Sequence, residues 1–261
     1  MSSENRTPID REAYGGPHPW QTQGWARLAR KMLRQREYFR WAEQYCNPLT
    51  IRGQENLATL NGPAIFIPNH QSHMDTPVIM SGLTESLQDN IYFGAAADRW
   101  FVKGKKKLIL QPWYQSLGLG TFPIVRGGGS KTLDYARELL RRDCNICIFP
   151  EGTRATGNEL GRFRHGVSIL AKEEGVPLVP VVLKGLRELR PKGARHITPG
   201  PASVTFLEPV TISADMEIPD ATQMLWEMMN REFGKPLQFP KPAALPEAAE
   251  ADTTENVERA A

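Results

Sequence analysis

Residues 65–75 read IFIPNHQSHMD, an apolar run that ends abruptly in two histidines and an aspartate. A short β-branched and aromatic run followed by Pro-Asn predicts a buried strand that delivers its last residues to the edge of a sheet. In α/β proteins this edge is where ligands bind and chemistry takes place. We therefore expect His70 at the carboxyl end of a buried strand.

The separation between His70 and Asp75 lets a tight turn or a first helical turn bring the carboxylate back onto the imidazole. A carboxylate that accepts from Nδ1–H fixes the tautomer and leaves Nε2 as the acceptor that a general base needs. Alone this spacing is weak evidence, because chance gives such a pair in roughly one chain in six with this composition. His73 has no assigned partner and is interpreted as a packing or capping residue, with a register that pairs it with Asp75 as the alternative.

Two more apolar runs, 120–125 and 146–149, end in charged or small residues. Strands ending at one sheet edge would bring these residues to the His70 segment. Together they would supply a carboxylate, a hydroxyl and two guanidinium groups. The residues concerned are Arg126, Glu151, Gly152, Thr153 and Arg154.

From about residue 49 to about residue 210 the chain resembles the glycerolipid acyltransferase family, whose best-known members acylate lysophosphatidic acid. The resemblance rests on four elements in the family's order, and the set is far more specific than any single motif. These are NHx4D at 69–75, GxFxxxR at 120–126, FPEGTR at 149–154 and VPLVPV at 176–181.

The resemblance implies roles for the site residues. His70 would be the general base and Asp75 its orienting partner, while Glu151, Gly152 and Thr153 would shape the acceptor site. Arg126 and Arg154 suit an anionic head group, because guanidinium pairs bidentately with phosphate or carboxylate. A structural ion pair, for example with Glu151, is the alternative for each arginine. The family often has a lysine after the strand at 91–95, where this chain has Asp98-Arg99.

The expected activity is transfer of a fatty acyl group from acyl-CoA or acyl-carrier protein to the hydroxyl of a lysophospholipid similar to 1-acylglycerol-3-phosphate. No Gly-x-Ser-x-Gly motif is present, so direct transfer is favoured over an acyl-enzyme. No cofactor, metal site or nucleic-acid partner is expected, and Cys144 and Cys147 are interpreted as structural because residues three apart on a strand face opposite sides. Alternatives are acyl-thioester hydrolysis, acylation of a soluble non-glycerolipid acceptor, and lipid binding without catalysis.

Alternating strands and helices predict an α/β fold, a single acyltransferase domain with a mixed, largely parallel sheet flanked by helices. We expect this domain at 48–235, an irregular arm and basic amphipathic helix at 1–47, and a disordered acidic tail at 236–261. Strands are predicted at 49–52, 64–68, 91–95, 120–126, 146–149, 178–183 and 203–206. Helices are predicted at 21–45, 76–87, 131–142, 163–173 and 222–233, with Ser130 as the cap of the third.

The predicted helix at 21–45 carries six basic and two acidic residues, a balance of +4. Trp25, Leu28, Met32 and Phe39 form a partial apolar stripe along it. The helix therefore either packs on its own domain or lies on an anionic lipid surface. No run of 18 apolar residues and no signal-peptide core is present, so we expect a cytoplasmic protein, peripheral on the inner face of the membrane.

Overall fold

The computed structural model describes residues 17–34, 39–102, 108, 111–125, 132–155, 157, 159–191, 194 and 196–237. Among these residues, no helix is both long and apolar enough to cross a membrane. Arg126, Ser130 and the lysines at 103 and 105–107 lie outside the described residues, as do the arm at 1–16 and the tail from 238. The division of the chain at 47/48 and 235/236 stays a prediction.

The described residues form one mixed sheet in the order β1-β7-β6-β2-β5-β3-β4. Neighbouring strands run parallel except β6 and β7, which are antiparallel. This confirms the predicted fold class. The strands are β1 (Cys46–Arg52), β2 (Ile65–Pro68), β3 (Ile91–Ala96), β4 (Thr121–Ile124), β5 (Asn145–Cys147), β6 (Leu178–Lys184) and β7 (Gly200–Phe206).

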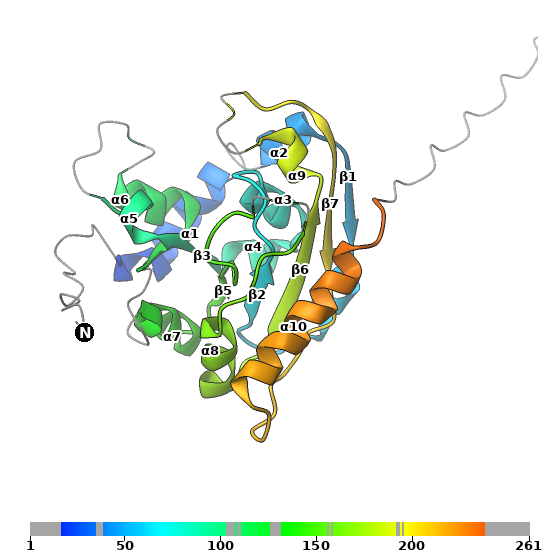
Figure 1. The fold of residues 1–261 in the computed structure, drawn as a ribbon. Helices are drawn as coiled ribbons and strands as arrows, with labels where there is room; N and C mark the ends of the chain where they lie inside the picture. Colours follow the sequence, from blue (N-terminus) through cyan, green and yellow to red (C-terminus); the bar gives the residue numbers. More distant parts are fainter. Residues whose placement is uncertain are drawn as a thin grey trace, which may run out of the picture.

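Helices cover both faces of this sheet (Figure 1). One core lies under α7 (Asp134–Arg141), α8 (Gly166–Glu174) and α10 (Ile218–Phe233), and the other under the 3-10 turn η3 (Gln54–Thr59), α3 (Asp75–Gly82) and α9 (Leu186–Leu189). In β2, Ile65 and Ile67 face the first core and Phe66 faces the second. Strands buried on both faces are apolar throughout, which explains the unbroken apolar runs of β2 and β6.

The carboxyl ends of β2, β3, β4, β5 and β6 share one edge, because β2 to β5 form a parallel set and β6 runs parallel to β2. The loops that leave this edge include residues 69–74 after β2 and 148–155 after β5. α5 (Ala97–Trp100) follows β3 directly, and α9 follows β6. This edge therefore gathers the segments that carry the predicted site residues.

The described residues confirm the predicted helix at 21–45 in part, and residues 35–38 lie outside them. The chain forms the 3-10 turn η1 (Pro19–Thr22), so the helix begins at Gly24 with α1 (Gly24–Arg34), and α2 (Arg40–Tyr45) follows. α1 packs on the π-helical turn η5 (Gln115–Leu119) and on α4 (Glu85–Asp89), whereas α2 packs on β1 and α3.

The predicted helix at 76–87 is divided into α3 and α4. The Gln88 side-chain amide donates to the carbonyl oxygens of Met80 and Leu83 at 3.0 and 2.8 Å, so it satisfies groups that the end of α3 leaves open. α7 begins three residues later than predicted, after a turn in which the Thr132 hydroxyl donates to the Val125 carbonyl. The short helix α6 (Pro112–Tyr114) precedes η5.

Candidate active site

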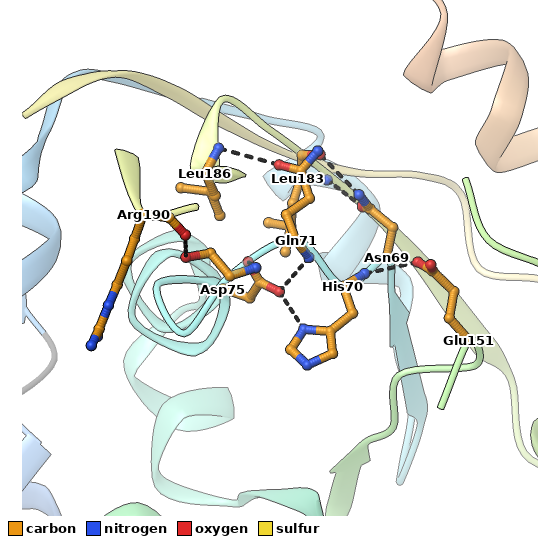
Figure 2. Close-up of polar contacts among 9 residues, drawn as sticks. Asn69, His70, Gln71, Asp75, Glu151, Leu183, Leu186 and Arg190 are labelled. Carbon is orange, nitrogen blue, oxygen red and sulfur yellow. Dashed lines mark hydrogen bonds and ion pairs between the residues drawn. The ribbon is translucent and has the colours of Figure 1, made fainter. Parts of the chain in front are cut away.

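His70 and Asp75 form a hydrogen-bonded pair at the carboxyl end of β2 (Figure 2). The strand ends at Pro68, and Asp75 is the first residue of α3. His70 Nδ1 lies 2.6 Å from Asp75 Oδ2, and the imidazole is 23% exposed while the carboxylate is 1% exposed. This pairing assigns the proton to Nδ1, so Nε2 is an acceptor on the side of the ring that faces away from Asp75.

The Asp75 carboxylate has a complete set of backbone donors. Oδ2 also accepts from the Gln71 amide at 2.8 Å, and Oδ1 accepts from the Ser72 amide at 2.9 Å. Burial raises the pKa of Asp75, and the hydrogen bonds from His70, Gln71 and Ser72 act in the opposite direction. Because all three donors favour the ionised form, they hold the carboxylate as the charged partner of His70.

Side chains on either side of His70 attach its loop to β6 and α9. The Asn69 side-chain amide donates to the Leu183 carbonyl at 3.0 Å and accepts from the Leu183 amide at 2.7 Å. The Gln71 side-chain oxygen accepts from the Leu186 amide at 3.2 Å. The loop is thus fixed at residues 69 and 71, and the His70 side chain projects between them (Figure 2).

Glu151 holds the backbone of His70. Its Oε1 accepts from the His70 amide at 2.9 Å and its Oε2 accepts from the Gly161 amide at 3.1 Å. A Cβ at Gly161 would lie 2.4 Å from that Oε2, so a side chain here would displace the Glu151 carboxylate. Burial raises the pKa of Glu151, with the two amide hydrogen bonds opposing. Direct contact between this carboxylate and substrate stays a prediction.

The turn after β5 lies beside the His70 loop. The Ala155 amide donates to the His70 carbonyl at 3.0 Å, and the His70 and Phe149 rings lie 4.2 Å apart between centroids. Gly152 has φ +68°, a conformation that side chains rarely adopt. Thr153 is exposed and Arg154 is half-buried. Burial lowers the pKa of Arg154, and Asp75 is among the charges that act on it, which puts its guanidinium in the field of the pair.

His73 has its own neighbours and does not pair with Asp75. Its Nε2 lies 3.4 Å from a guanidinium nitrogen of Arg99, and its ring lies edge-on to Trp100 at 5.8 Å between centroids. Burial, followed by the positive charges of Arg154, Arg99 and Arg190, lowers the pKa of His73 to about 4. A neutral His73 is therefore expected at physiological pH, and the alternative register is excluded because Asp75 Oδ2 bonds to His70.

The model of the family described as Acyltransferase matches residues 48–184, more than half of the chain. The chain belongs to the acyltransferase family. Its relatives include the chloroplastic 1-acyl-sn-glycerol-3-phosphate acyltransferase BAT2 of Brassica napus, with 30% identity over 69% of this chain and 50% of that protein. The human 1-acyl-sn-glycerol-3-phosphate acyltransferase beta is 31% identical over 58% of this chain and 52% of that protein. The chain thus spans about half the length of the curated relatives that it matches.

A solved structure shares the fold of this chain. It is the 1-acyl-sn-glycerophosphate (LPA) acyltransferase PlsC from Thermotoga maritima, with a TM-score of 0.61 and 24% identity. The match covers 80% of this chain and 78% of that one. At this identity the likeness establishes the architecture, a helix-flanked, mostly parallel sheet.

The candidate site gathers most of the residues selected from sequence, and it also contains residues that sequence reasoning did not select. His70, Asp75, Glu151 and Gly152 meet at one edge of the sheet, with Arg154 nearby. Sequence reasoning gave no role to Asn69, Gln71, Arg99 or Arg190. The departure from the family pattern at Asp98-Arg99 was the one sequence sign of Arg99, and nothing in the sequence singled out Arg190.

Proposed function

We propose that this acyltransferase moves a fatty acyl group from an acyl thioester to the hydroxyl of a lysophospholipid similar to 1-acylglycerol-3-phosphate. The observation that carries the proposal is the contact of 2.6 Å between His70 and Asp75 at the sheet edge, which leaves Nε2 as an acceptor on a partly exposed ring. The names of the related 1-acyl-sn-glycerol-3-phosphate acyltransferases support the choice of acceptor.

In the proposed reaction His70 acts as a general base. Nε2 removes the proton from the acceptor hydroxyl while the oxygen attacks the thioester carbonyl carbon and forms a C–O bond. The buried Asp75 carboxylate stabilises the imidazolium that results. The tetrahedral intermediate collapses with cleavage of the C–S bond, and the thiolate takes the proton from the imidazolium. The products are an ester and a free thiol, and no acyl-enzyme is formed.

The reaction class is tested by measuring thiol release and lipid products together. Acyl-CoA and acyl-carrier protein are supplied in turn, with and without a panel of lysolipids and glycerol phosphate, and products are identified by mass spectrometry. Transfer requires acceptor-dependent thiol release with one new ester for each thiol. Thiol release that ignores every acceptor would instead favour the hydrolase, and a water-soluble ester product would favour a soluble acceptor.

Replacing Arg126 or Arg154 by alanine is expected to weaken use of an anionic acceptor far more than use of the donor. A charge-assisted hydrogen bond contributes about 1.5–3 kcal/mol, so kcat/KM for 1-acylglycerol-3-phosphate should fall roughly 10- to 100-fold. Steady-state kinetics with the acceptor and the donor varied separately give the two effects. An equal loss with the neutral acceptor 1-acylglycerol would show that these arginines are structural.

We further propose that α1 rests on a lipid surface through its outward face. Trp25, Leu28 and Met32 are 56%, 64% and 69% exposed, and their spacing puts them on one side of the helix. The opposite side carries Arg30 and Arg34, which are buried and donate to backbone carbonyl groups. α1 therefore packs on its domain through its arginines and leaves its apolar stripe exposed to the surroundings. This arrangement suits reversible docking at an interface.

Trp25→Ser, Leu28→Ser and Met32→Ser together should abolish sedimentation with anionic phospholipid vesicles. The thermal unfolding midpoint should change little, because Leu28 and Met32 are mostly exposed and Trp25 contacts Trp20 and Gln23, which lie within five residues of it. Lys31→Gln is the matched control on the same helix. Lys31 is already paired with Glu85, and Asp89 lies 3.6 Å away, so its charge contributes little at a membrane. Full-length protein that ignores anionic vesicles at low salt would refute the docking and favour a soluble acceptor.

A further inference from the structure

Gly161 is fixed through both of its backbone groups. Its amide donates to Glu151 Oε2 at 3.1 Å, and its carbonyl oxygen accepts from the indole Nε1–H of Trp226 at 3.1 Å. A residue bonded through its N–H and its C=O cannot shift without losing one of the two bonds. Trp226 therefore holds in place the residue that orients the Glu151 carboxylate.

The Glu151 carboxylate carries this constraint to the backbone of His70. Its Oε1 accepts from the His70 amide at 2.9 Å (Figure 2), and the Ala155 amide donates to the His70 carbonyl at 3.0 Å. The segment after β5 thus bonds to both backbone groups of His70. Three hydrogen bonds in series join the indole of Trp226 to Gly161, Gly161 to Glu151, and Glu151 to His70. We call this series the Trp226 relay.

Trp226 has a rigid support, because α10 is packed firmly on the domain. The core face of this helix carries three fully buried side chains, Ala221, Leu225 and Met229. Trp226 packs against the same core, and the Thr222 hydroxyl lies 2.8 Å from the Ser168 hydroxyl on α8. α10 and α8 lie close together (Figure 1), and α8 begins five residues after Gly161. The indole is therefore held in register with the segment that it bonds.

The N–H group distinguishes the indole of Trp226 from other aromatic side chains. A buried tryptophan usually finds a partner for its N–H, and here a half-buried one bonds to the Gly161 carbonyl. Phenylalanine would keep an aromatic ring against the core but would remove the donor. α10 (Ile218–Phe233) lies beyond the residues 48–184 that match the family model. The constraint thus comes from a part of this chain that the model does not cover.

We propose that Trp226 is a positioning residue for the transfer reaction, acting on His70 through Gly161 and Glu151. The inference rests on the proposed function, because it takes His70 as the base. A general base must stay within hydrogen-bond reach of the proton that it removes, and small displacements of a reacting group lower the rate. Because Trp226 acts through three hydrogen bonds, its main effect falls on kcat and not on substrate binding.

Trp226→Phe should lower kcat about fivefold and change KM for acyl-CoA and for 1-acylglycerol-3-phosphate by less than about twofold. The loss is smaller than for Glu151→Gln, because Glu151 keeps its own bond to His70. Met229→Val is the matched control, since it shortens a buried side chain on the same face of α10 outside the relay. It should lower the unfolding midpoint but keep kcat below the unfolding transition. An equal loss of kcat in Met229→Val would overturn the proposal.

A double-mutant cycle distinguishes the relay from an independent structural role of Trp226. Glu151→Gln breaks the relay at its centre, so Trp226→Phe in that background should change kcat by less than about 1.5-fold. Two residues that act independently would give the same fivefold loss in both backgrounds. That additive outcome would show that Trp226 does not act through Glu151.

Amide hydrogen exchange, followed by NMR, separates failure of the relay from failure of the proposed function. The amides of His70 and Gly161 both donate to Glu151, whereas the Ile148 amide donates to the Phe66 carbonyl within the sheet and serves as the internal reference. Relative to the reference, both amides should exchange at least about fivefold faster in Trp226→Phe and at the wild-type rate in Met229→Val. This result supports the relay even if wild-type protein forms no ester. Unchanged relative exchange in Trp226→Phe refutes it.

Discussion

Replacing His70 by alanine should leave a folded protein whose acyl transfer is slower by about 10²–10⁴-fold, the range over which general bases contribute. The ring is partly exposed and stacks on Phe149, so its loss removes the base with little damage to the core. Initial rates of ester formation measure the effect, and circular dichroism verifies the fold. Near-normal turnover with an unchanged circular dichroism spectrum would contradict the assignment of the base.

Asp75→Asn should approach the loss caused by His70→Ala, because the base and its partner act as one unit. The carboxylate accepts three hydrogen bonds, from His70, Gln71 and Ser72, and an amide has one acceptor atom and one donor atom. At least one buried donor is then left unsatisfied, which costs about 1–3 kcal/mol of stability. The double variant should be little slower than His70→Ala alone. Asp89→Asn changes a partly exposed residue on α4, and this control should keep normal rates.

Glu151→Gln is the other change for which we expect a large effect. Its two carboxylate oxygens accept from the backbone amides of His70 and Gly161, and glutamine would turn an NH2 group toward one of them. The loop that carries the base would shift, and a displacement of about 1 Å can cost roughly 100-fold in rate. We therefore expect a fall in kcat of about 10- to 100-fold, together with a lower unfolding midpoint.

Glu159→Gln provides the comparison for this variant, because Glu159 is exposed on the same segment that follows β5. It should leave both kcat and the unfolding midpoint unchanged. If Glu151→Gln instead raised KM for the acceptor at constant kcat and constant stability, the carboxylate would contact the substrate directly, as the family resemblance implied. The split between kcat and KM therefore decides between a positioning role and a binding role.

Much of the fold was predictable because its strands are buried on both faces. The apolar runs that became β2 and β6 have a composition and length that admit few other structures, and their order along the chain specifies a largely parallel sheet. How the helix at 21–45 packs was harder to predict. Its outward face is apolar and its inward face carries Arg30 and Arg34, which reverses the pattern from which burial is inferred.

The pairing of His70 with Asp75 was predictable because the two residues are only five positions apart and Asp75 is the first residue of α3. The partners of Glu151 were not, since its acceptor role depends on backbone amides 81 and 10 residues away. Arg190 reaches the site only because β6 lies beside β2 in the sheet. Such contacts arise from tertiary packing, and no spacing in a single sequence encodes them.

Direct transfer by His70 is tested most sharply by following free thiol and lipid ester in the same reaction of wild-type protein with acyl-CoA and 1-acylglycerol-3-phosphate. The expected result is one diacylglycerol phosphate formed for each thiol released, with negligible thiol release when the acceptor is omitted. Mass spectrometry of the intact protein should show no acyl adduct, and His70→Ala should lose both products. Thiol released at the same rate with and without acceptor, or an acylated protein that forms and decays during turnover, would contradict direct transfer.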